Sequence, residues 1–290
     1  MRKTIITTCA AAIVCGSAMA KGGNPFLGKY TTPYGIPPFE QIKVEHYKPA
    51  FIKGMEEHKK EIDAIVNNKK TATFENTIAA LDRCGELLNK VASVFYGQNS
   101  ACTSDEMQAV SREISPLLSQ HSDDITMNAA LFKRVKYVYD HQSEEKLDKE
   151  QKKLLEETYK SFVRSGANLS ADKQEQLRKL NQEISMLQLT FGQNMLAETN
   201  AFQLVIDNKD DLAGLPQNLI ASAAEVAKER GLDGKWVFTL HNPSVMPFLQ
   251  YSDRRELRER MYKAYISCGC QGGKYDSREV VKKLVKARLE

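Results

Sequence analysis

The stretch from Ser170 to Asn200 constrains the fold more than any other part of this sequence. Its apolar residues recur at intervals of three and four, which places them on one side of an α-helix: Leu177, Leu180, Ile184, Leu187, Phe191 and Met195. Ser170 is predicted to cap this helix, because its hydroxyl can accept a hydrogen bond from a free amide of the first turn. A continuous helix here would be roughly 45 Å long at about 1.5 Å per residue. We therefore expect a long helix against which shorter helices pack.

The residues before this stretch predict a helical bundle. Residues 21–44 are rich in proline and glycine and predict an extended arm. Residues 45–168 then carry helical apolar patterns that alternate with capping residues. The predicted starts are near His46, after Thr73, at Ser104, at Asn128 and at Asp148, where Gln151 completes a capping box. A single helix is expected from Phe74 to Phe95.

The residues after the long stretch predict a smaller unit with some β-structure. Phe202–Ile206 and Trp236–Leu240 read as two short strands that could pair as a ribbon. Helices are expected at 215–229, from Asn242-Pro243, and from Asp253, which is spaced with Glu256 as a capping box. We thus expect a mainly α fold, with residues 169–290 forming the long helix and an incomplete second helical unit.

The last predicted helix lies in Tyr275–Glu290. Its apolar side is formed by Val280, Val281, Leu284 and Leu289. It reaches the final residue without a glycine, proline or polar tail, which are common stop signals of helices. The sequence therefore predicts that the chain is cut within a helix, with exposed apolar surface near its end.

Residues 1–20 read as a secretory signal peptide. Arg2 and Lys3 supply a positive start, a short apolar run follows, and Ala18 and Ala20 are the small residues that signal peptidase requires. Cleavage after Ala20 and export to a periplasm-like space are expected. The less favoured alternative is lipid anchoring through Cys15, which a valine precedes where a small residue is usual.

Charge and cysteine content exclude some classes of function. The formal net charge is +4, and removal of Arg2 and Lys3 leaves about +2, since 39 bases then face 37 acids. This gives no electrostatic case for binding nucleic acid or an anionic membrane. The four cysteines after the leader show no disulfide or metal-site spacing, and Cys268-Gly-Cys270 reads as a glycine-rich turn: Cys84, Cys102, Cys268 and Cys270.

No catalytic or metal-ligating residue can be assigned from the sequence. The five histidines form no helical pair for zinc, and there is no His-Glu-x-x-His, nucleophile elbow, phosphate loop or dinucleotide fingerprint. His58 is expected on a solvated helix face and His121 in a structural role near a helix end. His241, between a strand and a helix, is placed where a residue could contact a ligand. Four tyrosines are expected to pack with a polar tip rather than to act in catalysis: Tyr96, Tyr251, Tyr262 and Tyr265.

Ordered stretches throughout the chain after residue 20 resemble the amino-terminal part of bacterial peptidyl-dipeptidases, within the thimet oligopeptidase family of zinc metallopeptidases. The matching residues are Asn24–Phe26, Pro33–Phe39, Ile42–Lys43, Glu45–Phe51, Thr73–Ile78, Leu147–Asp148, Gln151–Lys152, Phe162–Leu169, Gln193–Asn194, Leu196–Ala201, Ala224, Ala227–Lys228, Arg230–Leu232, Gly234–Trp236, Asn242–Pro243 and Arg255–Arg258. The turn at Cys268-Gly-Cys270 departs from the polar, often arginine-containing sequence of the family.

The resemblance implies a largely helical peptidase of two lobes around a deep cleft, which removes dipeptides from the free carboxyl ends of short peptides. It also implies one zinc ion, held by a His-Glu-x-x-His helix and a further glutamate in the carboxyl-terminal half. None of these residues has a counterpart in this chain. We therefore expect the chain alone to bind no zinc and to be inactive. Its expected role is to form a wall or lid of the cleft, together with the carboxyl-terminal half as its partner. The alternative is a free-standing helical module that binds peptides without catalysis; substrate-binding residues stay unassigned.

Overall fold

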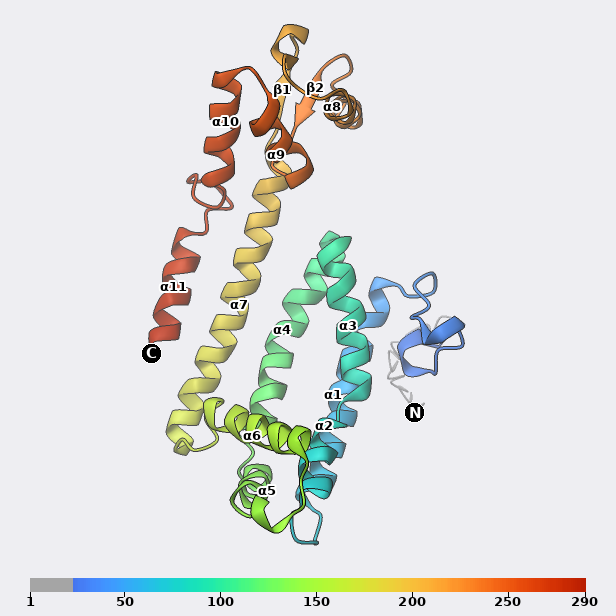
Figure 1. Cartoon of the computed structure of the whole chain (residues 1–290), viewed down its shortest axis with the longest axis vertical. Helices are drawn as coiled ribbons and strands as arrows, with labels where there is room; N and C mark the ends of the chain where they lie inside the picture. Colours follow the sequence, from blue (N-terminus) through green and yellow to red (C-terminus); the bar gives the residue numbers. More distant parts are fainter. Residues whose placement is uncertain (1–22) are drawn as a thin grey trace, which may run out of the picture.

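The computed structural model describes residues 23–290 and confirms a mainly α fold with one two-stranded ribbon. The predicted leader, with its cleavage point Ala20 and the alternative anchor Cys15, lies outside the described residues. Figure 1 shows a bundle of helices at the amino-terminal side, a long helix beside it, and the ribbon with short helices around the far end of that helix.

The first part of the bundle consists of α1 (Val44–Val66), α3 (Glu86–Ala101) and α4 (Asp105–Thr126). Their shared core is built from buried aliphatic and aromatic side chains, among which Phe95 contacts both Tyr47 and Phe51 edge to face. The arm at 23–43 has two short 3-10 turns, Pro25–Leu27 and Pro33–Gly35, and buries Phe26 in this core. The predicted arm is therefore held to the bundle by an apolar anchor.

The second part of the bundle lies around α5 (Ala129–Asp140) and α6 (Lys149–Arg164). The predicted caps of these helices are present: Asn128 accepts from the amides of Ala130 and Leu131, and Asp148 forms a capping box with Gln151. Their core includes Leu131, Val135, Leu155 and Phe162, and it also contains residues from the end of α1.

The helix predicted from Phe74 to Phe95 is broken in two. A π-helical segment, Phe74–Ala79, leads into α2 (Ala80–Asp82), and α3 starts only at Glu86. Gly85 separates them with φ of 78°, a left-handed conformation that glycine adopts without steric cost. Its amide donates to Glu61 Oε2 of α1 at 2.7 Å, so a contact from another helix fixes the break.

The long helix α7 spans Ala171–Ala201, close to the predicted bounds. It lies between α4 and α11 (Arg278–Leu289), as Figure 1 shows, and it packs against both. None of its 31 residues is fully buried, and Ser170 makes no side-chain capping bond, contrary to the prediction. The predicted apolar face exists, but neighbours cover it only in part, so α7 is a strut and not a central core helix.

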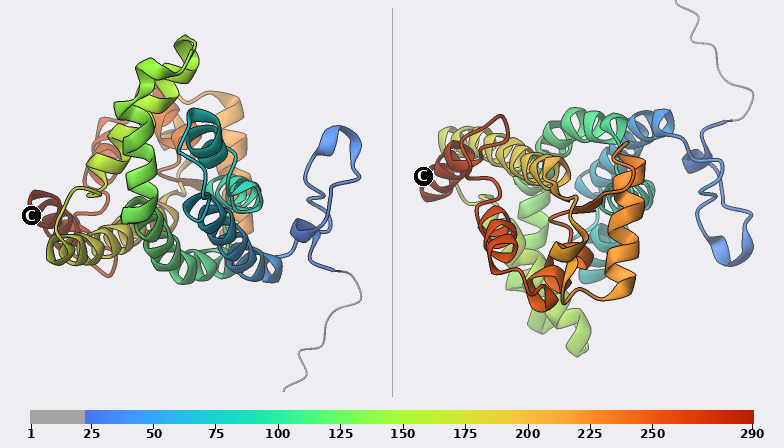
Figure 2. Two further views of the ribbon diagram at one scale, coloured as in Figure 1. Left: turned by 90° about the horizontal axis from the view of Figure 1, so that it is seen from below. Right: turned by 90° about the horizontal axis from the view of Figure 1, so that it is seen from above.

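The ribbon pairs β1 (Leu204–Ile206) with β2 (Trp236–Phe238), antiparallel, with Val205 opposite Val237. Around it lie α8 (Gln217–Glu229), α9 (Asn242–Tyr251) and α10 (Arg255–Ile266). The capping box predicted at Asp253 and Glu256 is absent, since Arg254 occupies the cap position without a side-chain bond. These elements enclose a core of their own, which includes Leu204, Phe238, Phe248 and Met261. Seen along the molecule in Figure 2, α8 and α10 stand apart on either side of α9.

Candidate functional site

A groove on one face of β2 is the first candidate site. Side chains alternate along a strand, so Trp236, Phe238 and Leu240 enter the core while Val237 and Thr239 face the other way. The groove has a volume of about 730 Å³, with the second face of β2 as its floor, α8 as one wall and α9 as the other. Its lining is mostly apolar, with hydroxyls at intervals, as in pockets that bind organic ligands.

His241, the histidine placed by sequence at a ligand-contacting position, lines this groove at the end of β2. Its Nδ1 lies 3.0 Å from Thr239 Oγ1, and its Nε2 lies 3.1 Å from Asn200 Oδ1 at the end of α7. Because the Asn200 oxygen can only accept, Nε2 donates this hydrogen bond, while the Thr239 hydroxyl can donate to or accept from Nδ1. Both ring nitrogens are thus engaged, and His241 offers its ring for contact but no free nitrogen for proton transfer.

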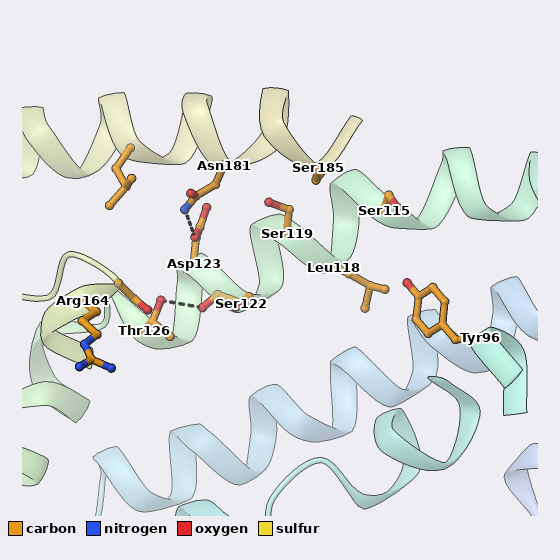
Figure 3. A pocket seen from close by; sticks show the side chains of 12 residues that line it. Tyr96, Ser115, Leu118, Ser119, Ser122, Asp123, Thr126, Arg164, Asn181 and Ser185 are labelled. Carbon is orange, nitrogen blue, oxygen red and sulfur yellow. Dashed lines mark hydrogen bonds between the residues drawn. The ribbon is translucent and has the colours of Figure 1, made fainter. Parts of the chain in front are cut away.

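The second candidate is a polar cavity of about 510 Å³ between α4 and α7 (Figure 3). Five serine hydroxyls line it, together with Tyr96 from α3, Arg164 from the end of α6 and Asp123 from α4. Asp123 is buried and accepts a hydrogen bond from Asn181 Nδ2 of α7 at 2.7 Å, and Figure 3 shows these two side chains facing each other. Burial raises the pKa of the Asp123 carboxyl, against the opposing effect of that hydrogen bond and of Arg178.

The two cavities contain two of the four tyrosines singled out by sequence: Tyr96 in the polar cavity and Tyr251 in the groove. Tyr262 is exposed, and Tyr265 packs against the core around the ribbon. In neither cavity does a serine lie in hydrogen-bond contact with a histidine that is itself oriented by a carboxylate, over the residues that the structure describes.

His58 is not on the solvated helix face that the sequence suggested, whereas His121 has the expected structural role near the end of α4. Both are half-buried, and His121 Nε2 of α4 lies 3.1 Å from His58 Nδ1 of α1. Burial lowers the pKa of both imidazoles, and the proximity of His58 lowers that of His121 further. The sequence contains no signal for this pairing, because 63 positions separate the two residues.

Cysteines and metal-ligand residues do not assemble into a centre. The four cysteines of the described chain are free, and Cys268 lies 3.6 Å from the Thr199 hydroxyl of α7. Over residues 23–290, no three histidine, cysteine or acidic side chains come together as metal ligands. Within the same range, every helix is too short or too polar to cross a bilayer.

Comparison with known proteins gives clear relatives. The chain is 38% identical over 267 residues to a dipeptidyl carboxypeptidase of Escherichia coli (strain K12), covering 92% of this chain and 39% of that protein. It is 33% identical over 262 residues to an oligopeptidase A of Haemophilus influenzae, covering 88% of this chain and 38% of that protein. The chain therefore spans about 39% of the length of these relatives, and the match is to their amino-terminal part. No protein-family model matches the chain.

Proposed function

The chain is homologous to the amino-terminal part of the dipeptidyl carboxypeptidases and oligopeptidases A, and we propose that it forms the non-catalytic wall or lid of the cleft of such a peptidase. The observation that carries this proposal is the asymmetry of the match. It takes in 92% of this chain but only 39% of the relative, so most of the relative has no counterpart in these 290 residues. In this proposal the unmatched part supplies the catalytic groups.

We place the zinc ion of the proposed enzyme in that unmatched part. A catalytic zinc ion needs three protein ligands in addition to water. The described residues bring no such set together, so they do not fit a zinc ion. We therefore assign no reaction step to this chain and no metal ligand to any of its residues.

The residues of this chain are proposed to contact the peptide and to limit its size. The groove beside His241 is mostly apolar, with a hydroxyl on its floor at Thr239 and one on each wall at Ser222 and Ser244, which suits a short extended peptide. The proposed substrates are short peptides with a free carboxyl end, from which the whole enzyme removes dipeptides. The relatives' names support peptidase activity for those proteins.

The test of this proposal compares two proteins on one substrate. The 290-residue chain and the product of its reading frame as it continues beyond codon 290 are each incubated with a short amino-blocked peptide. We expect the chain alone to release nothing and to carry no stoichiometric zinc. The continued product should contain a His-Glu-x-x-His motif, bind one zinc and release carboxyl-terminal dipeptides. Zinc and dipeptide release by the chain alone would refute the assignment.

The alternative function is a helical module that binds peptides without catalysis. It is favoured by the groove beside His241, because its mostly apolar lining with hydroxyls at intervals suits an organic ligand. A stop codon directly after Glu290, together with a folded and monodisperse protein, would support this alternative over the peptidase.

We further propose that the protein is exported after cleavage behind Ala20. The support is the charged start, apolar run and small residues of the first 20 positions. Amino-terminal sequencing of protein from a secreting host should begin at Lys21. Retention of Met1, or a lipid-modified Cys15, would contradict it.

A further inference from the structure

A cavity of about 690 Å³ lies between the end of α1, the loop that follows it and α5. We call it the basic pocket, because five cationic side chains line it: Lys69, Lys70, Lys133, Arg134 and Lys136. It lies on α5, at the end of the molecule opposite the ribbon (Figure 1), and is separate from both cavities described above.

The positive charge of the basic pocket is largely uncompensated. Asp140 is the single carboxylate in its lining, and Lys136 Nζ already pairs with it at 2.6 Å. Within residues 23–290, no carboxylate lies within 4.0 Å of the ammonium groups of Lys69, Lys70 or Lys133. Like charges held close together repel one another, so an anion bound here would be attracted by several of them at once.

Arg134 is a fixed charge in the wall of the pocket. Its Nη1 donates to the carbonyl oxygens of Asn68 and Lys70, and its Nη2 donates to Asn76 Oδ1 and Thr77 Oγ1. All four acceptors are neutral, so the guanidinium is held in place without its charge being cancelled. Its buried Nε has no hydrogen-bond partner among the described residues. The loop that carries two of the lysines is thereby tied to α5.

The pocket also has an apolar and an aromatic part. Val66, Ala72 and Ala130 contribute aliphatic surface, and Tyr137 stacks on His141 with ring centroids 4.1 Å apart. The volume is within the range of roughly 300–1,000 Å³ for pockets that hold small organic ligands. A ligand that fits must therefore combine negative charge with an organic body.

We propose that the basic pocket binds an acidic peptide segment through its carboxylates. A concave pocket of this size fits a few residues of peptide, whereas a membrane surface would require a flat or convex basic face. A nucleic acid would require a longer basic track than this one cavity, whose cations come from α5 and the loop after α1. This binding site does not depend on the proposed cleft function, because it lies on other elements and uses other residues.

The test measures the fluorescence anisotropy of fluorescein-labelled tetraglutamate during titration with the full chain. Binding is expected, and it should weaken at least about tenfold in Lys133→Glu, since an attraction becomes a repulsion. Lys69→Glu should act in the same direction. Raising the salt concentration should also weaken binding, because these lysines are exposed.

Four controls decide the outcome. Lys173→Glu reverses an exposed lysine of α7 outside the pocket, and it should leave the affinity unchanged. Labelled tetraglutamine should not bind, and inorganic phosphate at equal ionic strength should not displace tetraglutamate. Thermal unfolding should show that Lys133→Glu is folded. The proposal is overturned if Lys133→Glu binds like the parent, if tetraglutamine binds equally, or if phosphate displaces the peptide.

Discussion

At the scale of single residues, the contact between His58 and His121 joins α1 to α4 through one hydrogen bond of 3.1 Å. One of the two facing nitrogens must be unprotonated to accept this bond, so two imidazolium rings cannot form it. Burial lowers the pKa of both rings, while Glu61 acts in the opposite direction on His58 and Asp124 on His121. Lys59 adds to the lowering at His121.

We predict that this pair makes folding stability depend on pH. In the unfolded chain the two imidazoles take up protons near their ordinary pKa of about 6.5, whereas in the folded pair their pKa is lower. The contribution is therefore fully present above about pH 6.5 and is lost as the pH falls through the lowered pKa. Urea unfolding between pH 7.5 and 5 should show this decline, and His121→Gln should reduce it. His141→Gln, outside the pair, should not; an unchanged slope in His121→Gln would contradict the prediction.

Gly54 is a second residue whose role becomes clear only from packing. A methyl group on it would lie 2.9 Å from the Cα atom of Leu88, where α1 crosses α3. Gly54→Ala should therefore destabilise the fold by about 1–3 kcal/mol, although alanine is the better helix former. Gly97→Ala on α3 has open space around it and should stabilise by about 0.5–1 kcal/mol. Urea unfolding of the two variants checks both signs, and a stable Gly54→Ala would show that the helices can move apart.

At the scale of elements, helix positions could be predicted wherever periodicity and a cap agreed. The Asn128 and Asp148 caps and the two strands were placed correctly, because these signals are local in the chain. The break at Gly85 could not be predicted, since the partner of its amide is Glu61 of another helix. The long helix α7 was found by its pattern, but its partial exposure follows from which neighbours it meets.

The candidate sites were predicted less well than the elements. Sequence placed His241 where a ligand could be contacted, and the structure puts it in a groove. The sequence could not reveal that α8 and α9 flank that groove, or that Asn200 and Thr239 form hydrogen bonds with the two ring nitrogens. The cations of the basic pocket come from two segments more than 60 positions apart, and only folding brings them together.

The attachment of α7 to the turn before α11 leads to a prediction at this scale. The Glu198 carboxylate accepts a hydrogen bond from the Gly269 amide, and Asn194 Nδ2 donates to Ser277 Oγ at 3.3 Å. Glu198→Ala should cost about 1 kcal/mol and speed amide hydrogen exchange in residues 268–277, because a charged acceptor is lost. Glu183→Ala on the exposed face of α7 is the matched control and should leave that exchange unchanged. Equal exchange in both variants would mean that the turn is held by other contacts.

At the scale of the whole molecule, the apolar core is divided. The core around the ribbon is built from residues 202–265, whereas the two bundle cores end at Ala167. The intervening helix α7 has no fully buried residue and contributes to none of these cores. Cooperative unfolding depends on shared buried contacts, so the two ends of the molecule should be separate units of stability.

This division predicts that core mutations act on one end only. Phe248→Ala removes a fully buried ring near the ribbon and should lower the folding stability by about 3–5 kcal/mol. Leu131→Ala removes a fully buried side chain in the bundle and should lower it by about 2–5 kcal/mol. Hydrogen exchange measured by mass spectrometry should speed up in β1, β2 and α9 for the first variant, and in α5 and α6 for the second. At the other end, amide exchange should be as slow as in the parent protein, because α7 belongs to neither core and shares little buried surface with them. If either variant speeds exchange at both ends equally, α7 couples them into one cooperative unit.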